Sequence, residues 1–423
     1  MSTAAHKPLE PDPAAPPRRL LYIAPGFLSN RLKKHVRGVQ IFDLQLIRQL
    51  ASNGVHTTIL AERTWKARLD EALGDLITPN PTAPMPSSAT PSNSSLSSIS
   101  SNSTSIQNPK SNVQTSPIEV FYTPSLRKPL WNGLAAAALL TLQGRAWDVA
   151  YLGNAGEGMA FAAGALARLG RFRCLVLMAH RHPKRRIIAL LRRLGSRASA
   201  LAVSHHIRDL FPPDLRTRCQ VRFGEMEHDT FFPRALVPAA AEQSPPDAPR
   251  AAARPLRFIV LGALDTPLKD IPTALEAFVA LPADLRARCE LHLASFANPP
   301  APAALPAGVT AYAWMPPARV PEFLRTMDVM LVTSRSETFC LALVQGMLTG
   351  LPALCRSMVT LDEKLDTGAG IPFTTTAELT AAMEKLARDP ALRARMGALG
   401  RAAALERYCW DTPAFIREVL FPR

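Results

Sequence analysis

The feature that most constrains the fold is an alternation of short apolar strands with helical segments, which begins at residue 19 and begins again after residue 254. In the first unit, "RLLYIAP" (19–25) is typical of a buried strand. "QIFDLQLIRQLASNG" (40–54) has helical periodicity and a glycine stop, and "HTTILAE" (56–62) is rich in β-branched residues. Strand, helix and strand in this order form a βαβ unit, whose strands are parallel. We therefore predict an α/β fold with two doubly wound, Rossmann-like domains.

The 423 residues exceed what one hydrophobic core usually serves, which also favours two domains. Three segments lack a periodic apolar pattern: a Pro-rich start, a Ser/Asn/Pro tract and an Ala/Pro-rich run. The predicted organisation is a disordered tail (1–17), an N-terminal domain (18–233) with a disordered insertion (79–117), a linker (234–253), a C-terminal domain (254–405) and a final helix (406–423).

The charge balance indicates an anionic partner. Lysine and arginine (49) outnumber aspartate and glutamate (34), which gives a formal net charge of +15. Aromatic residues make up only 6% and no helix-turn-helix or RNP pattern occurs, so we expect no nucleic-acid partner. The six cysteines form no CxxC pair, which favours reduced thiols over disulfides or zinc. With no signal-like start and no apolar window of about 18 to 20 residues, we expect a cytoplasmic protein, free or at the inner membrane surface.

Five motifs occur in an order typical of one enzyme family: "RGVQIFDLQLIRQLASNGVHTTIL", "ALAVSHHIRDLF", "VRFGEMEHDTFFP", "FIVLGALDTPLKDIPTALEAF" and "SRSETFCLALVQGMLTGLPAL". With them the chain resembles the GT-B glycosyltransferases, specifically the retaining family 4 type (glycosyl transferases group 1). The resemblance covers nearly the whole chain apart from the tail, insertion and linker. It implies two domains facing an interdomain cleft, with the acceptor side in the N-terminal domain and the nucleotide-sugar side in the C-terminal domain. It also implies that the C-terminal helix packs back on the N-terminal domain.

The most specific motif begins at Glu337, between a Ser/Thr-rich turn and an apolar helix. The resemblance implies that Glu337 is a catalytic residue that binds hydroxyls of the donor sugar. It also implies that Thr338, Phe339, Cys340 and Leu341 bind the diphosphate, which free N–H groups and the positive end of a helix dipole favour. The alternative is a carboxylate that only stabilises the first helical turn.

Two positions of this motif depart from the family pattern. Gln345 stands where a second carboxylate usually accepts hydrogen bonds from the ribose, so we expect weaker or altered nucleotide binding. Alternatively, Gln345 is a buried helix residue without a ligand contact. Cys340 stands where glycine is usual, and its Cβ restricts how closely the backbone approaches a phosphate.

The turn "GALDTPLKD" (262–270) supplies a cation. The resemblance implies that Gly262 and Lys269 contact the donor and that Lys269, as a catalytic residue, offsets the charge of the leaving diphosphate. A solvated surface lysine is the alternative. Ala263 replaces the usual arginine, and Asp270, where glycine is common, is expected to neutralise Lys269 in part.

In the N-terminal domain the resemblance points to Gly38 and His180. Gly38 matches the second glycine of a Gly-Gly turn at the donor, with Arg37 in place of the first. His180 ends a strand where the family commonly has a histidine facing the donor sugar, so we predict a catalytic contact. A structural role is one alternative, and a metal site with His182 is a weaker one because no acid or cysteine lies nearby in the sequence. Ser204 is expected to cap the next helix.

Residues 181–197, "RHPKRRIIALLRRLGSR", contain seven Lys/Arg and no acidic residue. Such a basic amphipathic helix can lie on anionic lipid. Equally, its apolar stripe can face the protein core.

We therefore predict a retaining glycosyltransferase for cell-envelope glycan synthesis. It would move a sugar from a UDP- or GDP-sugar to a glycan or lipid-linked acceptor, without a metal or other cofactor. Because of the departures from the pattern, a non-catalytic GT-B-like nucleotide-sugar-binding or regulatory subunit is the alternative. A GT-B epimerase is a third interpretation.

Overall fold

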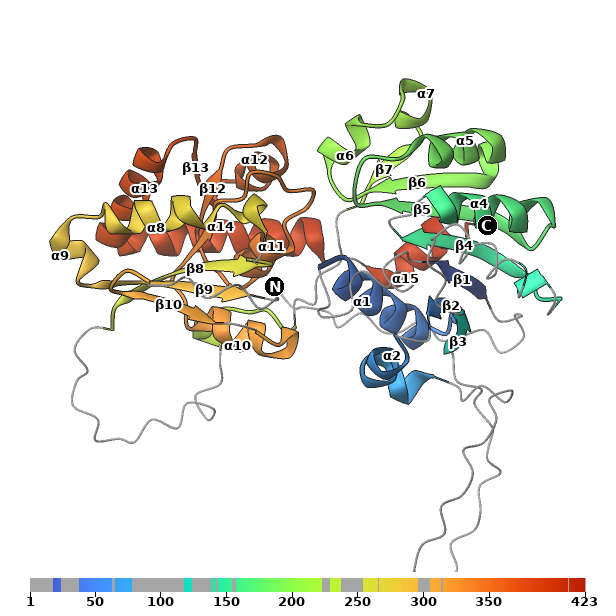
Figure 1. Cartoon of the computed structure of the whole chain (residues 1–423), viewed down its shortest axis with the longest axis horizontal. Helices are drawn as coiled ribbons and strands as arrows, with labels where there is room; N and C mark the ends of the chain where they lie inside the picture. Colours follow the sequence, from blue (N-terminus) through green and yellow to red (C-terminus); the bar gives the residue numbers. More distant parts are fainter. Residues whose placement is uncertain are drawn as a thin grey trace, which may run out of the picture.

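The computed structural model describes two α/β lobes and parts of the segments that join them (Figure 1). The described residues are 18–23, 38–62, 65–77, 118–123, 138, 140–141, 144–153, 157–222, 229–236, 254–264, 266–295, 305–312, 315–409 and 411–422. The predicted tail (1–17), the predicted insertion (79–117) and residues 237–253 of the predicted linker lie outside them.

The first lobe (18–222) is built on a parallel sheet in the order β3-β2-β1-β4-β5-β6-β7. Its strands are β1 (Arg19–Ile23), β2 (His56–Glu62), β3 (Ile118–Thr123), β4 (Trp147–Gly153), β5 (Phe172–Ala179), β6 (Ala198–Ala202) and β7 (Cys219–Val221). The central strands are buried on both faces, as a parallel sheet requires.

The second lobe (254–409) is built on a parallel sheet in the order β10-β9-β8-β11-β12-β13. Its strands are β8 (Leu256–Gly262), β9 (Cys289–Ser295), β10 (Val309–Tyr312), β11 (Val329–Val332), β12 (Ala353–Arg356) and β13 (Gly370–Phe373). The predicted α/β fold with two doubly wound sheets is confirmed.

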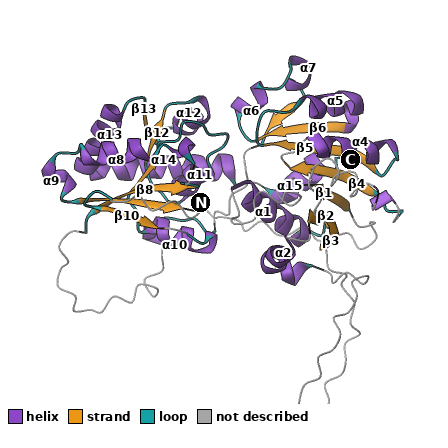
Figure 2. Ribbon diagram, in the orientation of Figure 1, coloured by secondary structure: helices purple, strands orange, loops and turns teal. Residues whose placement is uncertain are grey.

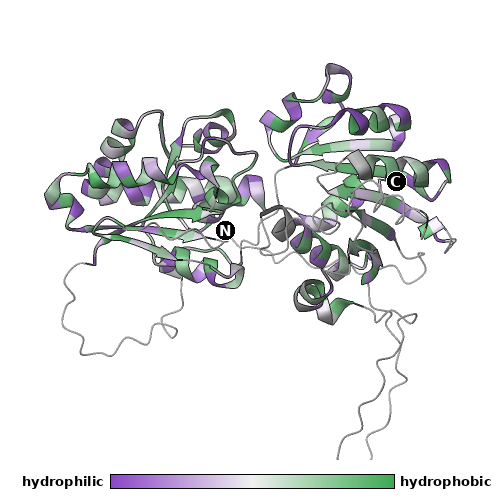
Figure 3. Ribbon diagram, viewed as in Figure 1, coloured by the Kyte–Doolittle hydropathy of each residue, from purple (hydrophilic) through white to green (hydrophobic). Residues whose placement is uncertain are grey.

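Helices cover both faces of each sheet (Figure 2). Those of the first lobe are α1 (Gly38–Ser52), α2 (Lys66–Leu73), α4 (Glu157–Arg168), α5 (Arg185–Leu194), α6 (His205–Asp209) and α7 (Pro213–Arg216). Those of the second are α8 (Ile271–Val279), α9 (Ala283–Arg286), α10 (Val320–Arg325), α11 (Leu341–Leu348), α12 (Val359–Leu365), α13 (Thr376–Arg388) and α14 (Pro390–Tyr408). The apolar residues concentrate on the strands and on the helix faces that cover them (Figure 3). Within the described part of the chain, no helix has the length and apolar character that a bilayer span needs.

The strand order reverses next to β1 in the first sheet and next to β8 in the second. At such a switch point the loops after neighbouring strands diverge, which is where doubly wound proteins bind ligands. The strands of both sheets run toward the space between the lobes (Figure 1), and α6 contacts α12 across it. Both carboxyl edges therefore face the same region.

The C-terminal segment returns to the first lobe, as predicted. The guanidinium of Arg222 lies 5.8 Å from the ring centroid of Phe415, and that of Arg18 lies 5.6 Å from that of Phe421. The prediction of one helix over 406–423 was wrong, because α14 ends at Tyr408. Two short helices, α15 (Thr412–Phe415) and a π-helical turn (Ile416–Leu420), follow it.

Candidate functional site

Two loops at the carboxyl edge of the second sheet bring predicted donor residues together. β8 ends at Gly262 and leads through a 3₁₀ turn (Pro267–Lys269) into α8, while β11 leads into α11. β8 and β11 are hydrogen-bonded neighbours, so the loops after them start side by side. Lys269 and Glu337 consequently meet although they lie 68 residues apart in the sequence.

Lys269 and Glu337 form a largely buried ion pair. Nζ of Lys269 lies 2.6 Å from Oε1 of Glu337, and the two side chains are 19% and 13% exposed. Burial lowers the pKa of Lys269, but the charge of Glu337 outweighs it and holds this pKa above its usual value. The backbone at Gly262 lies against the lysine side chain, since an added Cβ would come within 2.9 Å of Lys269 Cε. Lys269 is therefore charged and fixed in position by Glu337 and the Gly262 backbone, and is not a solvated surface lysine.

Asp270 does not neutralise Lys269, so that expectation was wrong. Its carboxylate is 4% exposed and accepts hydrogen bonds from Arg335 (3.0 Å), Arg356 (2.6 Å) and Thr273 (2.9 Å). Burial raises the pKa of Asp270, but these donors and the two arginine charges hold it below its usual value. The negative charge of Asp270 is thus paired with Arg335 and Arg356 and not with Lys269.

Five side chains form what we call the charged cluster: Lys269, Asp270, Arg335, Glu337 and Arg356. Three cations and two carboxylates give it a net charge of +1. Two threonines fix its backbone, because Thr333 Oγ1 donates to the Lys269 carbonyl (2.8 Å) and Thr360 Oγ1 donates to that of Glu337 (3.0 Å). Sequence reasoning missed both arginines, although Arg335 stands only two residues before Glu337.

Cys340 is the N-cap residue of α11 and has the left-handed conformation, with φ 63° and ψ 69°. Glycine adopts this conformation at the lowest cost, which gives a physical reason for the family's glycine at the matching position. Burial above all raises the pKa of the Cys340 thiol to about 12, so the thiol stays protonated. Leu341 opens the helix, and the N–H groups of Leu343 (3.1 Å) and Val344 (3.4 Å) donate to the Cys340 carbonyl. The N–H groups of Leu341 and Ala342 precede the first intrahelical acceptor.

The two residues before Cys340 differ in what they offer. Thr338 is exposed, whereas Phe339 is buried with its ring 5.8 Å from that of Tyr408. Nζ of the fully buried Lys364 lies 5.0 Å from the Phe339 ring and donates to the Thr360 carbonyl at 2.9 Å. Phe339 therefore offers only its backbone to the carboxyl edge of the sheet, while its side chain packs against Tyr408 and Lys364.

Gln345 lies in α11 and is 5% exposed. Its Oε1 is buried and has no hydrogen-bond partner within the described residues. A buried carbonyl oxygen without a donor costs free energy, on the order of 1–3 kcal/mol. The side chain thus offers an acceptor that the folded chain itself does not use.

The predicted residues of the first lobe lie at the facing edge. His180 follows β5, is 7% exposed, and burial lowers its pKa to about 3, so it is neutral at physiological pH. Gly38 begins α1, while Arg37 lies outside the described residues. Ser204 caps α6 as predicted, since its Oγ accepts from the Ile207 N–H at 3.2 Å.

A buried carboxylate that sequence reasoning missed lies on the buried side of α1. Asp43 is 1% exposed, and its Oδ1 accepts a 2.6 Å hydrogen bond from the Tyr22 hydroxyl, while its Oδ2 has no partner within the described residues. The Tyr22 ring packs against that of Tyr151 from the neighbouring strand, with centroids 4.9 Å apart and the ring planes tilted by 30°. Burial raises the pKa of Asp43 to about 7. The signal for it was a lone acid in the apolar helix "QIFDLQLI".

The basic helix α5 turns its apolar stripe to the core. Ile187, Leu190 and Leu191 are buried, whereas Arg185 and Arg186 are exposed. The alternative in which the apolar stripe faces the core is confirmed, and binding of the basic face to anionic lipid stays a prediction. What remains available to a surface is the basic face alone.

Comparison with known proteins assigns the second lobe. Residues 255–389 match the family model for glycosyl transferases group 1. No curated protein matches the chain.

Solved structures resemble the chain over most of its length. Sucrose-phosphate synthase from Thermosynechococcus elongatus has a TM-score of 0.62 and 14% identity, covering 94% of this chain and 96% of that one. The Anabaena protein Alr3699/HepE in complex with UDP has a TM-score of 0.61 and 14% identity, covering 92% and 96%. WaaG, a glycosyltransferase involved in lipopolysaccharide biosynthesis, has a TM-score of 0.58 and 13% identity, covering 96% and 100%. The chain has the GT-B fold, with a glycosyl transferases group 1 domain as its second lobe.

Proposed function

We propose that the protein is a glycosyltransferase that moves a sugar from a UDP- or GDP-sugar to a hydroxyl of a glycan or lipid-linked acceptor, with retention at the anomeric carbon. The observation that carries this proposal is the Lys269–Glu337 ion pair beside the start of α11. It lies at the carboxyl edge of a doubly wound sheet, the usual ligand edge of such folds. The match of 255–389 to group 1 transferases supports it, as do the UDP and UDP-glucose complexes of the Anabaena structure.

The donor diphosphate would bind the N–H groups of residues 338–341 and the ammonium of Lys269. A helix start favours an anion by about 0.3–1 kcal/mol per charge, and more where it is partly buried. Negative charge grows on the diphosphate as the glycosidic bond breaks, so the fixed cation and N–H groups stabilise the transition state more than the ground state. In this proposal they neutralise the leaving group without a metal or other cofactor.

The sugar and the ribose would use the remaining polar groups. Glu337, 2.6 Å from Lys269, would accept hydrogen bonds from sugar hydroxyls. The unpartnered Oε1 of Gln345 would accept one from the ribose. Closure of the lobes would bring His180, which is neutral, against the sugar from the opposite side.

We place the acceptor at the inner face of the cytoplasmic membrane, in cell-envelope glycan synthesis. The exposed basic face of α5 supports this location, because each such charge contributes about 1 kcal/mol near an anionic lipid surface. The likeness to WaaG points the same way.

A non-catalytic, nucleotide-sugar-binding subunit is the second candidate. It is favoured by the replacement of a carboxylate by Gln345 and of an arginine by Ala263.

A thermal melting screen with UDP, GDP and their sugar conjugates tests the proposal. A ligand at 100 times its Kd adds about 2.7 kcal/mol to the free energy of unfolding, which raises Tm measurably. We expect one nucleotide sugar to raise Tm and to be turned over. Stabilisation without donor hydrolysis or transfer would favour the binding subunit, and no stabilisation by any nucleotide would contradict both.

A further inference from the structure

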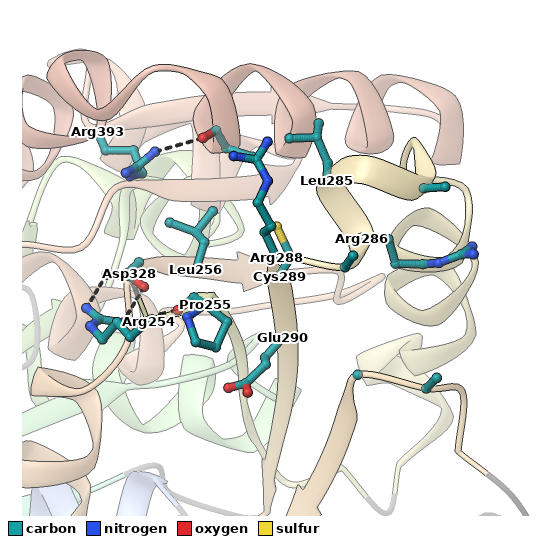
Figure 4. A pocket seen from close by; sticks show the side chains of 15 residues that line it. Arg254, Pro255, Leu256, Leu285, Arg286, Arg288, Cys289, Glu290, Asp328 and Arg393 are labelled. Carbon is teal, nitrogen blue, oxygen red and sulfur yellow. Dashed lines mark hydrogen bonds and ion pairs between the residues drawn. The ribbon is translucent and has the colours of Figure 1, made fainter. Parts of the chain in front are cut away.

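A cavity of about 840 Å³ opens at the amino edge of the second sheet (Figure 4). It lies where β8 and β9 begin and where α13 passes into α14, and its lining includes Arg254, Leu256, Arg288, Glu290 and Arg393. β8 runs from Leu256 at this cavity to Gly262 beside the charged cluster, a span of about 20 Å at roughly 3.3 Å per residue. The cavity is therefore separate from the proposed donor site.

Both carboxylates of this cavity are already paired. Asp328 accepts two hydrogen bonds from Arg254 (2.8 and 2.6 Å) and one from the N–H of Arg257 (2.8 Å). Glu290 lies 3.0 Å from Nε of Arg257 and 3.1 Å from Nε2 of His292. Neither carboxylate is left to neutralise the other cations of the wall.

Arg393 has no such carboxylate partner among the described residues, and Arg288 has only a distant one. Arg393 donates to the carbonyls of Leu386 and Ala387, and no described carboxylate lies within 4.0 Å of its guanidinium. Nε of Arg288 donates to the Asp284 carbonyl (3.2 Å), and its guanidinium comes only within 3.9 Å of the exposed Asp284 carboxylate. Figure 4 shows these two side chains along the same wall, where α13 meets α14, whereas Arg286 points away. That wall is positively charged.

We propose that this cavity binds a small phosphorylated molecule, with the phosphate on Arg288 and Arg393 and the rest against Pro255 and Leu256. A guanidinium matches phosphate in shape and donates two parallel hydrogen bonds to it. The volume falls within the range of about 300–1,000 Å³ that small-molecule sites occupy. Because the cavity is remote from the charged cluster, its ligand is distinct from the proposed donor.

Isothermal titration calorimetry of the full-length protein with glucose 6-phosphate tests the site, with glucose as the neutral control ligand. We expect saturable binding of the phosphate ester, none of glucose, and no displacement by excess UDP. The double variant Arg288→Ala/Arg393→Ala should lower the affinity at least about tenfold, because two charge-assisted contacts are lost. Arg395→Ala, an exposed position of α14 outside the cavity lining, is the matched control and should leave the affinity unchanged.

Arg393 also donates to the Leu386 carbonyl at the end of α13, so the double variant could lose stability as well as affinity. The single variant Arg288→Ala is therefore measured too. It removes an exposed side chain and leaves the contacts of Arg393 with the α13 carbonyls intact. This single variant should weaken binding while the melting temperature stays the same. Unchanged affinity in both variants, displacement by UDP, or no saturation up to about 10 mM would overturn the proposal.

Discussion

The carboxyl edges of the two sheets differ in whether they stabilise the charged or the neutral forms of their ionisable groups. At the second edge, Lys269 and Glu337 are paired, and Asp270 binds two arginines, so the charged forms are stabilised. At the first edge, burial lowers the pKa of His180 to about 3 and raises that of Asp43 to about 7. Burial without an opposite charge favours the neutral form, whereas burial with one favours the charged form. The second edge thus keeps its ionisable groups charged, and the first keeps His180 neutral.

The largest expected effect comes from removing the carboxylate of the second edge. Glu337→Gln should lower the rate of donor turnover by about 10²–10³-fold, since a charged contact to the reacting sugar is lost. Nucleotide affinity should stay within about twofold, because the diphosphate is held by other groups. Release of UDP or GDP from the donor measures the rate and calorimetry the affinity. An equal loss of both would make Glu337 a structural residue.

The second prediction concerns Asp43, at the carboxyl edge of the first sheet. The pKa of Asp43 is about 7 in the folded chain and about 4 when unfolded, so the folded state binds the extra proton between these values. Its contribution to stability is complete below pH 4 and is lost as the pH rises through 7. Asp43→Asn keeps an acceptor for Tyr22 and removes the charge. Between pH 4 and 8 the free energy of unfolding, measured with urea, should therefore fall less in the variant than in the parent. The difference between the two falls should be on the order of a few kcal/mol. If the free energy of unfolding changes with pH equally in the two proteins, the pKa of Asp43 is the same in the folded and unfolded chains.

Gln345→Glu introduces a negative charge at the carboxyl edge of the second sheet without changing the size of the side chain. The ribose hydroxyls gain a charged acceptor, so UDP or GDP should bind about tenfold more tightly, while the ligand-free protein melts at a lower temperature because the buried carboxylate has no partner. Calorimetry and melting curves measure the two effects. If affinity does not change, Gln345 is a packing residue without a ligand contact.

The smallest effect is expected at the start of α11. Cys340→Gly removes the cost of a left-handed φ, about 1–2 kcal/mol, and clears the Cβ beside the phosphate position. Cys340→Ala is the matched control, since it removes the thiol and keeps the Cβ. Nucleotide affinity should rise about threefold in the glycine variant relative to alanine. Equal affinities would place the phosphate away from this turn.

Much of the fold could be predicted from the sequence because long buried strands between helices leave a clear pattern. The predicted strand at 56–62 agrees with β2 to the residue. Strands β7, β10 and β13 were not predicted, because they are short strands at the sheet edges without a continuous buried apolar run.

The candidate site could be predicted only where a local motif carries it. Lys269 and Glu337 stand in recognisable turns, and their contact follows from neighbouring strands. The partners of Asp270 could not be predicted, because Arg356 lies 86 residues away and only tertiary structure brings it there. The pKa of Asp43 likewise depends on burial between elements distant in the sequence.

The most direct test of the account is titration calorimetry of UDP and GDP into the parent protein and Lys269→Ala. We expect one nucleotide to bind the parent, and its affinity to be lower by about 10- to 100-fold in the variant, because the ammonium proposed to meet the diphosphate is gone. Equal affinity in the two proteins, or no binding to the parent, would contradict a diphosphate site at the start of α11.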